Sequence, residues 1–323
     1  MAGCHLRRED YTVGWVCALP VELAAAQEML DEEHQDLPQN DNDSNIYTLG
    51  RIGKHHVVIA CLPEGQMGNN SAAAVAVQMK LAFTSIRFGL MVGIGGGVPS
   101  EEVDIRLGDV VVNRPHKVHG GVVQYDFGKT TPSGFERTGF LNTPPTILLN
   151  AVAKLRANHM RGMSRLSEYV FRFDSLPTFT RKDAEPDVLF QADYDHEGGA
   201  TCEGCSKERV VDRHSLRQEV VVHYGTIASG NRVMRDAAER DRVSAELGGV
   251  LCFEMEAAGL MNNFPCLVIR GICDYADSHK NKKWQAYAAG TAAACAKEVL
   301  SVIPPAEVAK ARTVDETTTV TSG

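Results

Sequence analysis

Short β-rich runs alternate with runs of helical periodicity along most of the chain, and this alternation most constrains the fold. Residues 11–19 (YTVGWVCAL) have the apolar character of a buried strand, and Pro20 suits the first turn of the helix that follows. The same alternation returns between residues 220 and 300. Alternation of this kind is typical of a sheet covered by helices on both faces. The sequence therefore predicts a single α/β domain with a central mixed sheet.

The predicted elements can be placed by their residue ranges. We expect further strands at residues 46–50, 56–62, 88–92, 108–113, 220–228, 250–253 and 266–272. We expect helices at residues 21–30, 70–82, 146–157, 234–247, 255–262 and 283–300. The predicted domain spans residues 11–303, after a tail at 1–10, with an irregular insertion at about 160–218 and a polar, disordered tail at 304–323.

The composition of the chain restricts the kinds of molecule that it can bind. The 33 Lys and Arg residues are outnumbered by 41 Asp and Glu, which gives a net charge of −8 and disfavours nucleic-acid binding. No apolar run approaches the roughly 18 residues of a membrane span, and the first residues contain no apolar signal region. Nine cysteines, several of them in apolar runs, indicate reduced thiols. We therefore expect a soluble, cytoplasmic protein that binds neither nucleic acid nor membranes.

A glycine cluster follows the strand expected at residues 88–92. Gly93, Gly95, Gly96 and Gly97 would let the backbone approach a ligand closely, although a purely structural turn is the alternative. The dinucleotide fingerprint G-x-G-x-x-G is not satisfied, because position 98 is valine. The cluster therefore predicts a turn beside a ligand rather than a dinucleotide site.

Carboxylates stand at three junctions between strands and helices. Glu254 and Glu256 lie in FEMEAAG with apolar residues on both sides, and either can be a ligand for sugar hydroxyls or a partner of the helix dipole. Asp274 lies in RGICDYAD, where the alternative to a catalytic role is a helix cap or an ion pair with Arg270. Glu22 begins the first helix.

These motifs occur in a recognisable order. CALPVE, VGIGGG with LGDVVV, SGN, FEMEAAG and RGICDYAD resemble the purine nucleoside phosphorylase/nucleosidase superfamily, which includes methylthioadenosine/S-adenosylhomocysteine nucleosidase. The version here is most similar to nucleosidase-like domains found in fungi beside NACHT or ankyrin modules. The resemblance covers residues 11–300 apart from the insertion. It implies a three-layer α/β/α sandwich around a mixed, partly barrel-like sheet, usually in a homo-oligomer.

The resemblance also implies roles for individual residues. Glu256 would bind the ribose 2′- and 3′-hydroxyls, with Met255 packed under the sugar. Asp274 would protonate or hydrogen-bond purine N7, and Glu22 would position and deprotonate the attacking water. Residues expected beside the substrate with them are Phe253, Glu254, Val233, Met234, Gly95 and Gly96.

The expected reaction is hydrolysis. The arginine and serine that hold phosphate in phosphorylases of this superfamily correspond to Met91 or Val92 and to Ile94, and apolar side chains cannot stabilise a phosphate dianion. We therefore expect a purine nucleosidase acting on an adenine-type nucleoside or 5′-nucleotide, with ATP among the candidates because members of the wider group are implicated in cleaving ATP. The alternatives are a phosphorylase that uses Arg106 or Arg114, or a non-catalytic nucleotide-sensing module. Catalysis requires no cofactor.

Two further groups of residues are candidates for binding a substrate phosphate and a metal ion. Arg114, His116, Lys117 and His119 form a locally basic stretch that we expect to face a substrate phosphate, the alternative being a solvated loop. His196, Cys202, Cys205 and His214 form H-x5-C-x2-C-x8-H within the insertion and are a candidate structural zinc site, with Asp212 as a substitute for His214. The alternative is two reduced cysteines in a loop.

Overall fold

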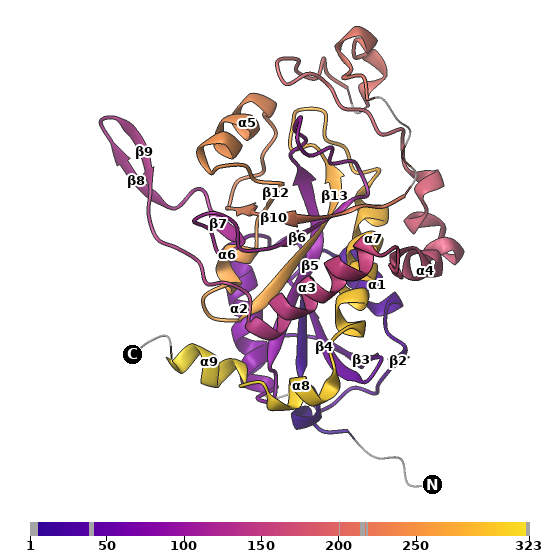
Figure 1. Cartoon of the computed structure of the whole chain (residues 1–323), viewed down its shortest axis with the longest axis vertical. Helices are drawn as coiled ribbons and strands as arrows, with labels where there is room; N and C mark the ends of the chain where they lie inside the picture. The colour runs from indigo at the N-terminus through magenta and orange to yellow at the C-terminus, as the bar shows by residue number, and fades with distance from the viewer. Residues whose placement is uncertain (1–5, 39–41, 200, 214–216, 218, 321–323) are drawn as a thin grey trace.

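A mixed sheet of eleven strands runs through the middle of the molecule (Figure 1). The computed structural model describes residues 6–38, 42–199, 201–213, 217 and 219–320. The main path of the sheet has the strand order β10-β6-β13-β5-β1-β4-β3-β2, and β12, β11 and β7 form a branch from β5. The strands are β1 (Val13–Cys17), β2 (Glu32–Glu33), β3 (Tyr47–Ile52), β4 (His55–Cys61), β5 (Phe88–Gly97), β6 (Val110–Asn113), β7 (Val122–Gln124), β10 (Val222–Gly225), β11 (Ile227–Ser229), β12 (Cys252–Glu254) and β13 (Cys266–Asp274). A separate hairpin, β8 (Gly128–Thr131) with β9 (Gly134–Arg137), projects from the body.

Helices cover both faces of this sheet, because alternate strand residues are apolar on each side. One apolar cluster joins the sheet to α1, α3, α4 and α7, and a second joins the opposite face to α2 and α6. This arrangement confirms the predicted α/β/α sandwich. The helices are α1 (Pro20–Glu28), α2 (Asn69–Ala82), α3 (Thr146–Met160), α4 (Leu166–Val170), α5 (Ala237–Glu246), α6 (Ala257–Leu260), α7 (Gln285–Ser301), α8 (Pro305–Lys310) and α9 (Val314–Val320).

Strand β5 belongs to both parts of the sheet. It pairs in parallel with β1 and β13, and its last residues, Gly96 and Gly97, pair antiparallel with β12. The glycine cluster is therefore strand, and the prediction of a turn after residue 92 was wrong. Glycine is needed in this strand because the strands on both sides are close: a Cβ on Gly95 would lie 2.4 Å from Cys252 Sγ. Glycine here lets two sheet branches meet on one strand.

Two segments lie outside this framework. Between α3 and β10 the described residues form α4 and several short 3-10 turns; α4 lies at the right of the molecule in Figure 1, and the later part of this segment lies at its upper end. Residues 305–320, which we expected to be a disordered tail, instead form α8 and α9. Val308 and Val314 are buried, and Val314 N–H donates to the Ile86 carbonyl at 2.8 Å. The expectation was wrong because two apolar residues in a polar segment find partners on the body.

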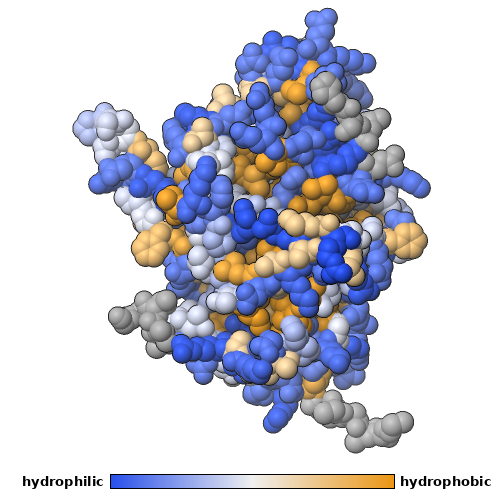
Figure 2. Space-filling view, viewed as in Figure 1, coloured by the Kyte–Doolittle hydropathy of each residue, from blue (hydrophilic) through white to orange (hydrophobic). Residues whose placement is uncertain are grey.

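The surface of the molecule is mainly polar. Figure 2 shows hydrophilic side chains over most of one face, with hydrophobic ones visible in the hollows between them. Within the described ranges, no helix has both the length and the apolar character required to cross a bilayer.

Candidate active site

A cavity of about 210 Å³ lies where β1, β5, β12 and β13 end. All ten residues that the sequence placed at a catalytic or substrate position line it. They are Glu22, Gly95, Gly96, Val233, Met234, Phe253, Glu254, Met255, Glu256 and Asp274. Residues more than 250 positions apart in the sequence thus meet at one end of the sheet, on the side where open α/β sheets bind ligands.

The Glu22 carboxylate is fixed by three backbone donors. Its Oε2 accepts hydrogen bonds from Ala18 N–H at 2.7 Å and Leu19 N–H at 3.0 Å, and its Oε1 accepts one from Ile94 N–H at 2.8 Å. Burial nevertheless raises the pKa of Glu22, although these donors and Arg270 act in the opposite direction. The result is a carboxylate in a fixed orientation and with increased basicity, as a general base requires.

Two carboxylates, those of Glu254 and Glu256, contact Arg270, which is a fully buried residue of β13. Arg270 Nη2 donates to Glu254 Oε2 and, at 3.3 Å, to Glu256 Oε2. Glu254 also accepts hydrogen bonds from the backbone N–H of residues 256 and 257, so it caps the start of α6. Burial raises the pKa of Glu256 to about 7. Both glutamates line the cavity, but Glu254 accepts two backbone hydrogen bonds at the start of α6, whereas Glu256 has fewer partners.

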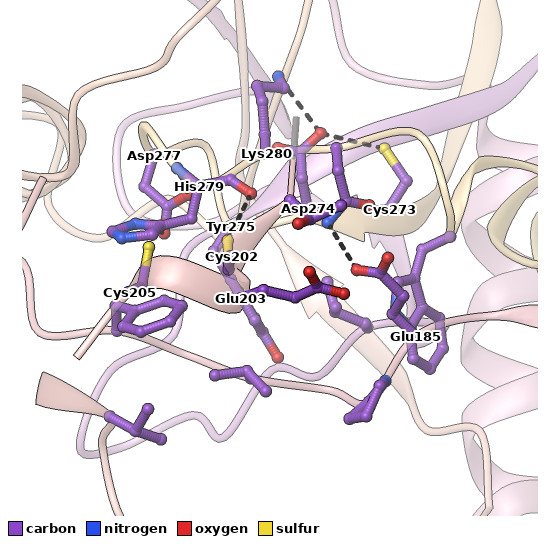
Figure 3. A pocket seen from close by; sticks show the side chains of 18 of the residues that line it. Glu185, Cys202, Glu203, Cys205, Cys273, Asp274, Tyr275, Asp277, His279 and Lys280 are labelled. Atoms are coloured by element: carbon purple, nitrogen blue, oxygen red, sulfur yellow. Dashed lines mark hydrogen bonds and ion pairs between the residues drawn. The ribbon is translucent and has the colours of Figure 1, made fainter. Parts of the chain in front are cut away.

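Asp274 pairs with a lysine rather than with Arg270. Lys280 Nζ lies 3.2 Å from Asp274 Oδ2, and the Cys273 thiol donates to the same oxygen at 3.2 Å (Figure 3). Asp274 Oδ1 accepts a hydrogen bond from Ala276 N–H at 2.9 Å. A Cβ on Gly96 would lie 2.8 Å from Asp274 Oδ1, so glycine at this position makes room for the carboxylate. The expected alternative, an ion pair with Arg270, is not observed.

The apolar part of the lining comes from strand β12 and from the loop before α5. Phe253 is buried and makes an edge-to-face contact with Tyr125, with ring centroids 5.4 Å apart. Met234 is buried beside it, whereas Val233 is 52% exposed at the cavity mouth. Such a surface suits the flat face of a heterocyclic base.

Sequence reasoning missed three cationic residues of this region. Lys280 and Arg232 line the cavity, and Arg270 holds two of its carboxylates. The signal for Arg270 was a lone arginine within an otherwise apolar strand, since such a charge needs buried partners. Lys280 lies six residues after Asp274, in a loop whose path the sequence does not define.

The basic stretch is not part of this cavity, so the expectation that it faces the substrate was wrong. Lys117 Nζ donates to the Gly248 carbonyl at 2.5 Å, and His119 Nε2 donates to the Leu247 carbonyl at 3.1 Å. His116 and His119 pair with each other through their backbones. Arg114 N–H bonds to the Gly225 carbonyl of β10 at 3.0 Å, and the chain that follows turns towards the end of α5. The residues expected to face phosphate were Arg114, His116, Lys117 and His119.

The candidate metal residues are partly brought together. The ligand atoms of His196, Cys202 and Cys205 all lie within 4.8 Å of one another. His214, the fourth predicted ligand, lies outside the described residues. Asp212, the substitute considered for it, is exposed and does not belong to the group.

The chain belongs to the Phosphorylase superfamily, because the family model of that description matches residues 12–303. A nucleotide-binding leucine-rich repeat (NLR)-like protein of Hyaloscypha variabilis is 51% identical over 93% of this chain. A 5′-methylthioadenosine/S-adenosylhomocysteine nucleosidase of Mycobacterium bovis is 24% identical over 91% of this chain and 97% of its own length. An ATP nucleosidase of Escherichia coli is 24% identical over 85% of this chain.

Coverage differs among these relatives. This chain spans 30% of the length of the fungal protein and 48% of the length of the ATP nucleosidase. Among solved structures, the 5′-methylthioadenosine/S-adenosylhomocysteine nucleosidase of Neisseria meningitidis in complex with methylthio-immucillin-A superimposes with a TM-score of 0.58. That alignment covers 90% of this chain and 98% of the other at 16% identity, and it shows a shared fold.

Proposed function

We propose that the protein is a nucleosidase that hydrolyses the N-glycosidic bond of a purine nucleoside or 5′-nucleotide, with an adenine base preferred. The products would be the free base and ribose or a ribose phosphate. One observation carries the proposal: Glu22, Glu256 and Asp274, from three distant parts of the sequence, line one cavity that also has an apolar wall for a base. The nucleosidases among the relatives support it.

The chemistry follows from the positions of the carboxylates. Glu22 takes a proton from a water whose oxygen forms a bond to C1′, and the C1′–N9 bond breaks with its electron pair passing to the base. Asp274 hydrogen-bonds or protonates purine N7, which makes the base a better leaving group. The carboxylates near the sugar stabilise the positive charge that develops on it, as in glycoside hydrolysis. Glu256 holds the ribose hydroxyls.

Hydrolysis is favoured over phosphorolysis by the lining of the cavity. Ile94 lies at the glycine segment, and Arg270 is engaged by two carboxylates. Arg106 and Arg114, considered as phosphate ligands, are absent from the lining, and Arg106 Nε donates to Asp104 at 2.8 Å. A phosphate dianion beside the glycine segment would therefore meet Glu22 and Ile94, which repel or fail to stabilise it.

The group at the 5′ carbon is the open part of the proposal. The E. coli relative is an ATP nucleosidase and the M. bovis relative is a 5′-methylthioadenosine/S-adenosylhomocysteine nucleosidase. Lys280 and Arg232 are the cations in the described lining; Arg232 is exposed, and Lys280 lies 3.2 Å from Asp274. We propose a 5′-nucleotide such as ATP as the preferred substrate, because these cations can pair with phosphate oxygens.

The test is release of free base from a panel of adenosine, inosine, methylthioadenosine and ATP in phosphate-free buffer, followed by chromatography. We expect adenine from at least one adenine substrate, with no increase when phosphate is added. Phosphate-dependent formation of ribose 1-phosphate would establish a phosphorylase instead. Tight nucleotide binding without release of base by a folded protein would establish a sensing module.

Two properties of the protein as a whole belong to the same proposal. We propose a cytoplasmic location, supported by eight free cysteines in the described part of the chain, which a reducing compartment preserves. We also propose a homo-oligomer, as is usual in this superfamily. Light scattering coupled to gel filtration tests the oligomer, and a monomeric mass at the assay concentration would contradict it.

A further inference from the structure

The insertion brings three metal-ligating side chains to one point, outside the cavity described above. His196 Nδ1 lies 3.2 Å from Cys205 Sγ and 3.8 Å from Cys202 Sγ. Tetrahedral zinc with the usual Zn–S and Zn–N bond lengths of about 2.3 and 2.0 Å places such atoms about 3.6 Å apart. Both nitrogen–sulfur distances are thus close to those around a single zinc ion, and the two sulfur atoms lie within 4.8 Å of each other.

The histidine has the tautomer that a metal ligand needs. His196 Nε2 lies 3.2 Å from the Gly199 carbonyl, which can only accept, so Nε2 carries the proton. The lone pair is then on Nδ1, the nitrogen that faces both sulfur atoms. A carbonyl that orients the far nitrogen of a histidine in this way is typical of metal-binding histidines.

A second histidine beside the group, His279, has one ring nitrogen, Nδ1, 3.9 Å from Asp277 Oδ2. The imidazole of His279 is buried, and its Nε2 is without a hydrogen bond among the described residues. Its ring centroid lies 5.6 Å from that of His196, and Cys202 Sγ lies 3.9 Å from the His279 carbonyl oxygen. Buried ring nitrogens are rarely left unsatisfied, so Nε2 is a candidate for a bond to a ligand near the three residues.

We propose that His196, Cys202 and Cys205 bind one Zn²⁺ ion, with the fourth position filled by His279 or water. Two thiolates and an imidazole select zinc over hard cations such as magnesium or calcium. Zinc binds cysteine as the thiolate, so binding would release the thiol protons to solvent.

The ion would fix the wall of a large hollow. Cys202, Cys205 and His279 line a space of about 620 Å³ that also contains Asp274 and Lys280 (Figure 3). His196 N–H donates to Ser278 Oγ at 3.0 Å, and Phe190 stacks on His279 with ring centroids 4.0 Å apart. The insertion is thus attached to the loop that follows β13, and zinc would hold it there, next to the candidate active site.

The test measures metal rather than activity, so its result is independent of the proposed reaction. The protein is expressed with zinc in the medium, purified without chelator under reducing conditions, and analysed by inductively coupled plasma mass spectrometry. We expect about one zinc per chain in the wild type and its loss in Cys202→Ser and His196→Ala. The control Cys61→Ser, a partly exposed thiol outside the group, should keep it.

If a variant fails to fold, the test still decides the proposal, because metal binding is also measured on the wild type alone. Cobalt added to the metal-free wild type should produce a thiolate-to-cobalt charge-transfer band and intense visible bands of tetrahedral cobalt. A wild type with no more zinc than Cys202→Ser and no such band would overturn the proposal. So would a Cys202–Cys205 disulfide in the freshly purified protein.

Discussion

At the scale of single residues, the candidate site depends on carboxylates held in a buried environment. Glu22 is the clearest case, because three backbone N–H groups fix its two oxygens while burial raises its pKa. A carboxylate that is both oriented and more basic than usual suits the activation of water. A carboxylate with only a structural role would more simply be paired with a cation than with three backbone N–H groups.

Replacing Glu22 with glutamine removes the proposed base while keeping its size. We expect kcat to fall about 10²- to 10⁴-fold, the usual contribution of general-base catalysis. The control is Glu28→Gln at the other end of α1, where the side chain lies 3.9 Å from Arg172 and away from the cavity. Initial rates of base release measure the effect, and equal rates for both variants would contradict the role of Glu22.

The ionisation of Glu256 predicts a pH dependence of activity. Its pKa is raised to about 7 by burial, so the carboxylate is largely protonated in mildly acidic solution. If the ionised form binds the ribose hydroxyls, kcat/KM should rise with pH and level off above about pH 7. A rate profile from pH 5 to 9 checks this, and a constant kcat/KM across that range would contradict it.

The same pKa shift predicts the opposite trend for stability. The folded state holds the Glu256 proton more tightly than the unfolded chain does, in which the pKa is near its ordinary value of 4.5. Its contribution to the free energy of unfolding is present below about pH 4.5 and is lost as the pH rises through about 7. Glu256→Gln should therefore lose less thermal stability than the wild type between pH 5 and pH 8. A steeper loss in the variant would refute the shift.

At the scale of elements, strand β5 is what allows the carboxylates to meet. A Cβ on Gly93 would lie 2.4 Å from Glu22 Oε1 and 2.7 Å from Arg270 Nη1. The glycine therefore permits a helix residue and a strand residue to approach each other across β5. A glycine-rich strand, usually a weakness in a sheet, here makes room for charged side chains.

Substitution of Gly93 by alanine tests this explanation. We expect a loss of about 1–3 kcal/mol in the free energy of unfolding, because the added methyl group overpacks a filled site. In a Glu22→Ala background the loss should be smaller, since one of the two clashing side chains is truncated. Chemical denaturation of the four proteins gives the coupling, and additive losses would show that Glu22 and Gly93 do not interact.

At the scale of the whole molecule, the last two helices close one end of the sandwich. Val308 of α8 joins the apolar cluster on one face of the sheet, and Val314 of α9 joins the cluster on the other. Arg87 Nη1 donates to the Ala311 carbonyl between them at 2.8 Å. These residues connect both layers, so they belong to the folded body.

Adjacent residues of α8 give a matched pair for this claim. Val308→Asp buries an unpaired charge and should lower the free energy of unfolding by about 3 kcal/mol. Ala309→Asp changes an exposed neighbour and should have an effect within about 0.5 kcal/mol. Denaturant unfolding followed by circular dichroism measures both. Similar stability of the two variants would indicate that α8 is not part of the core.

The sequence by itself determined the order of the elements and the positions of the carboxylates, because both depend on local patterns. Apolar runs define strands, helical periodicity defines α2, α3 and α7, and Glu22, Glu256 and Asp274 were recognisable as residues at strand ends. Glu22, the glycines and Asp274 come together because the carboxyl ends of the parallel strands β1, β5 and β13 share one edge of a sheet, and the antiparallel pairing of β12 with β5 adds residues 253–256.

Only the tertiary structure decided which distant groups become partners. Arg270 pairs with Glu254 and Glu256, Asp274 pairs with Lys280, and the basic stretch after β6 turns to α5. The glycine segment becomes strand because β12 and β13 both pair with it, and residues 305–320 become helical because the body buries their valines. These outcomes depend on contacts between residues far apart in the chain. A local sequence pattern does not contain the energies of such contacts.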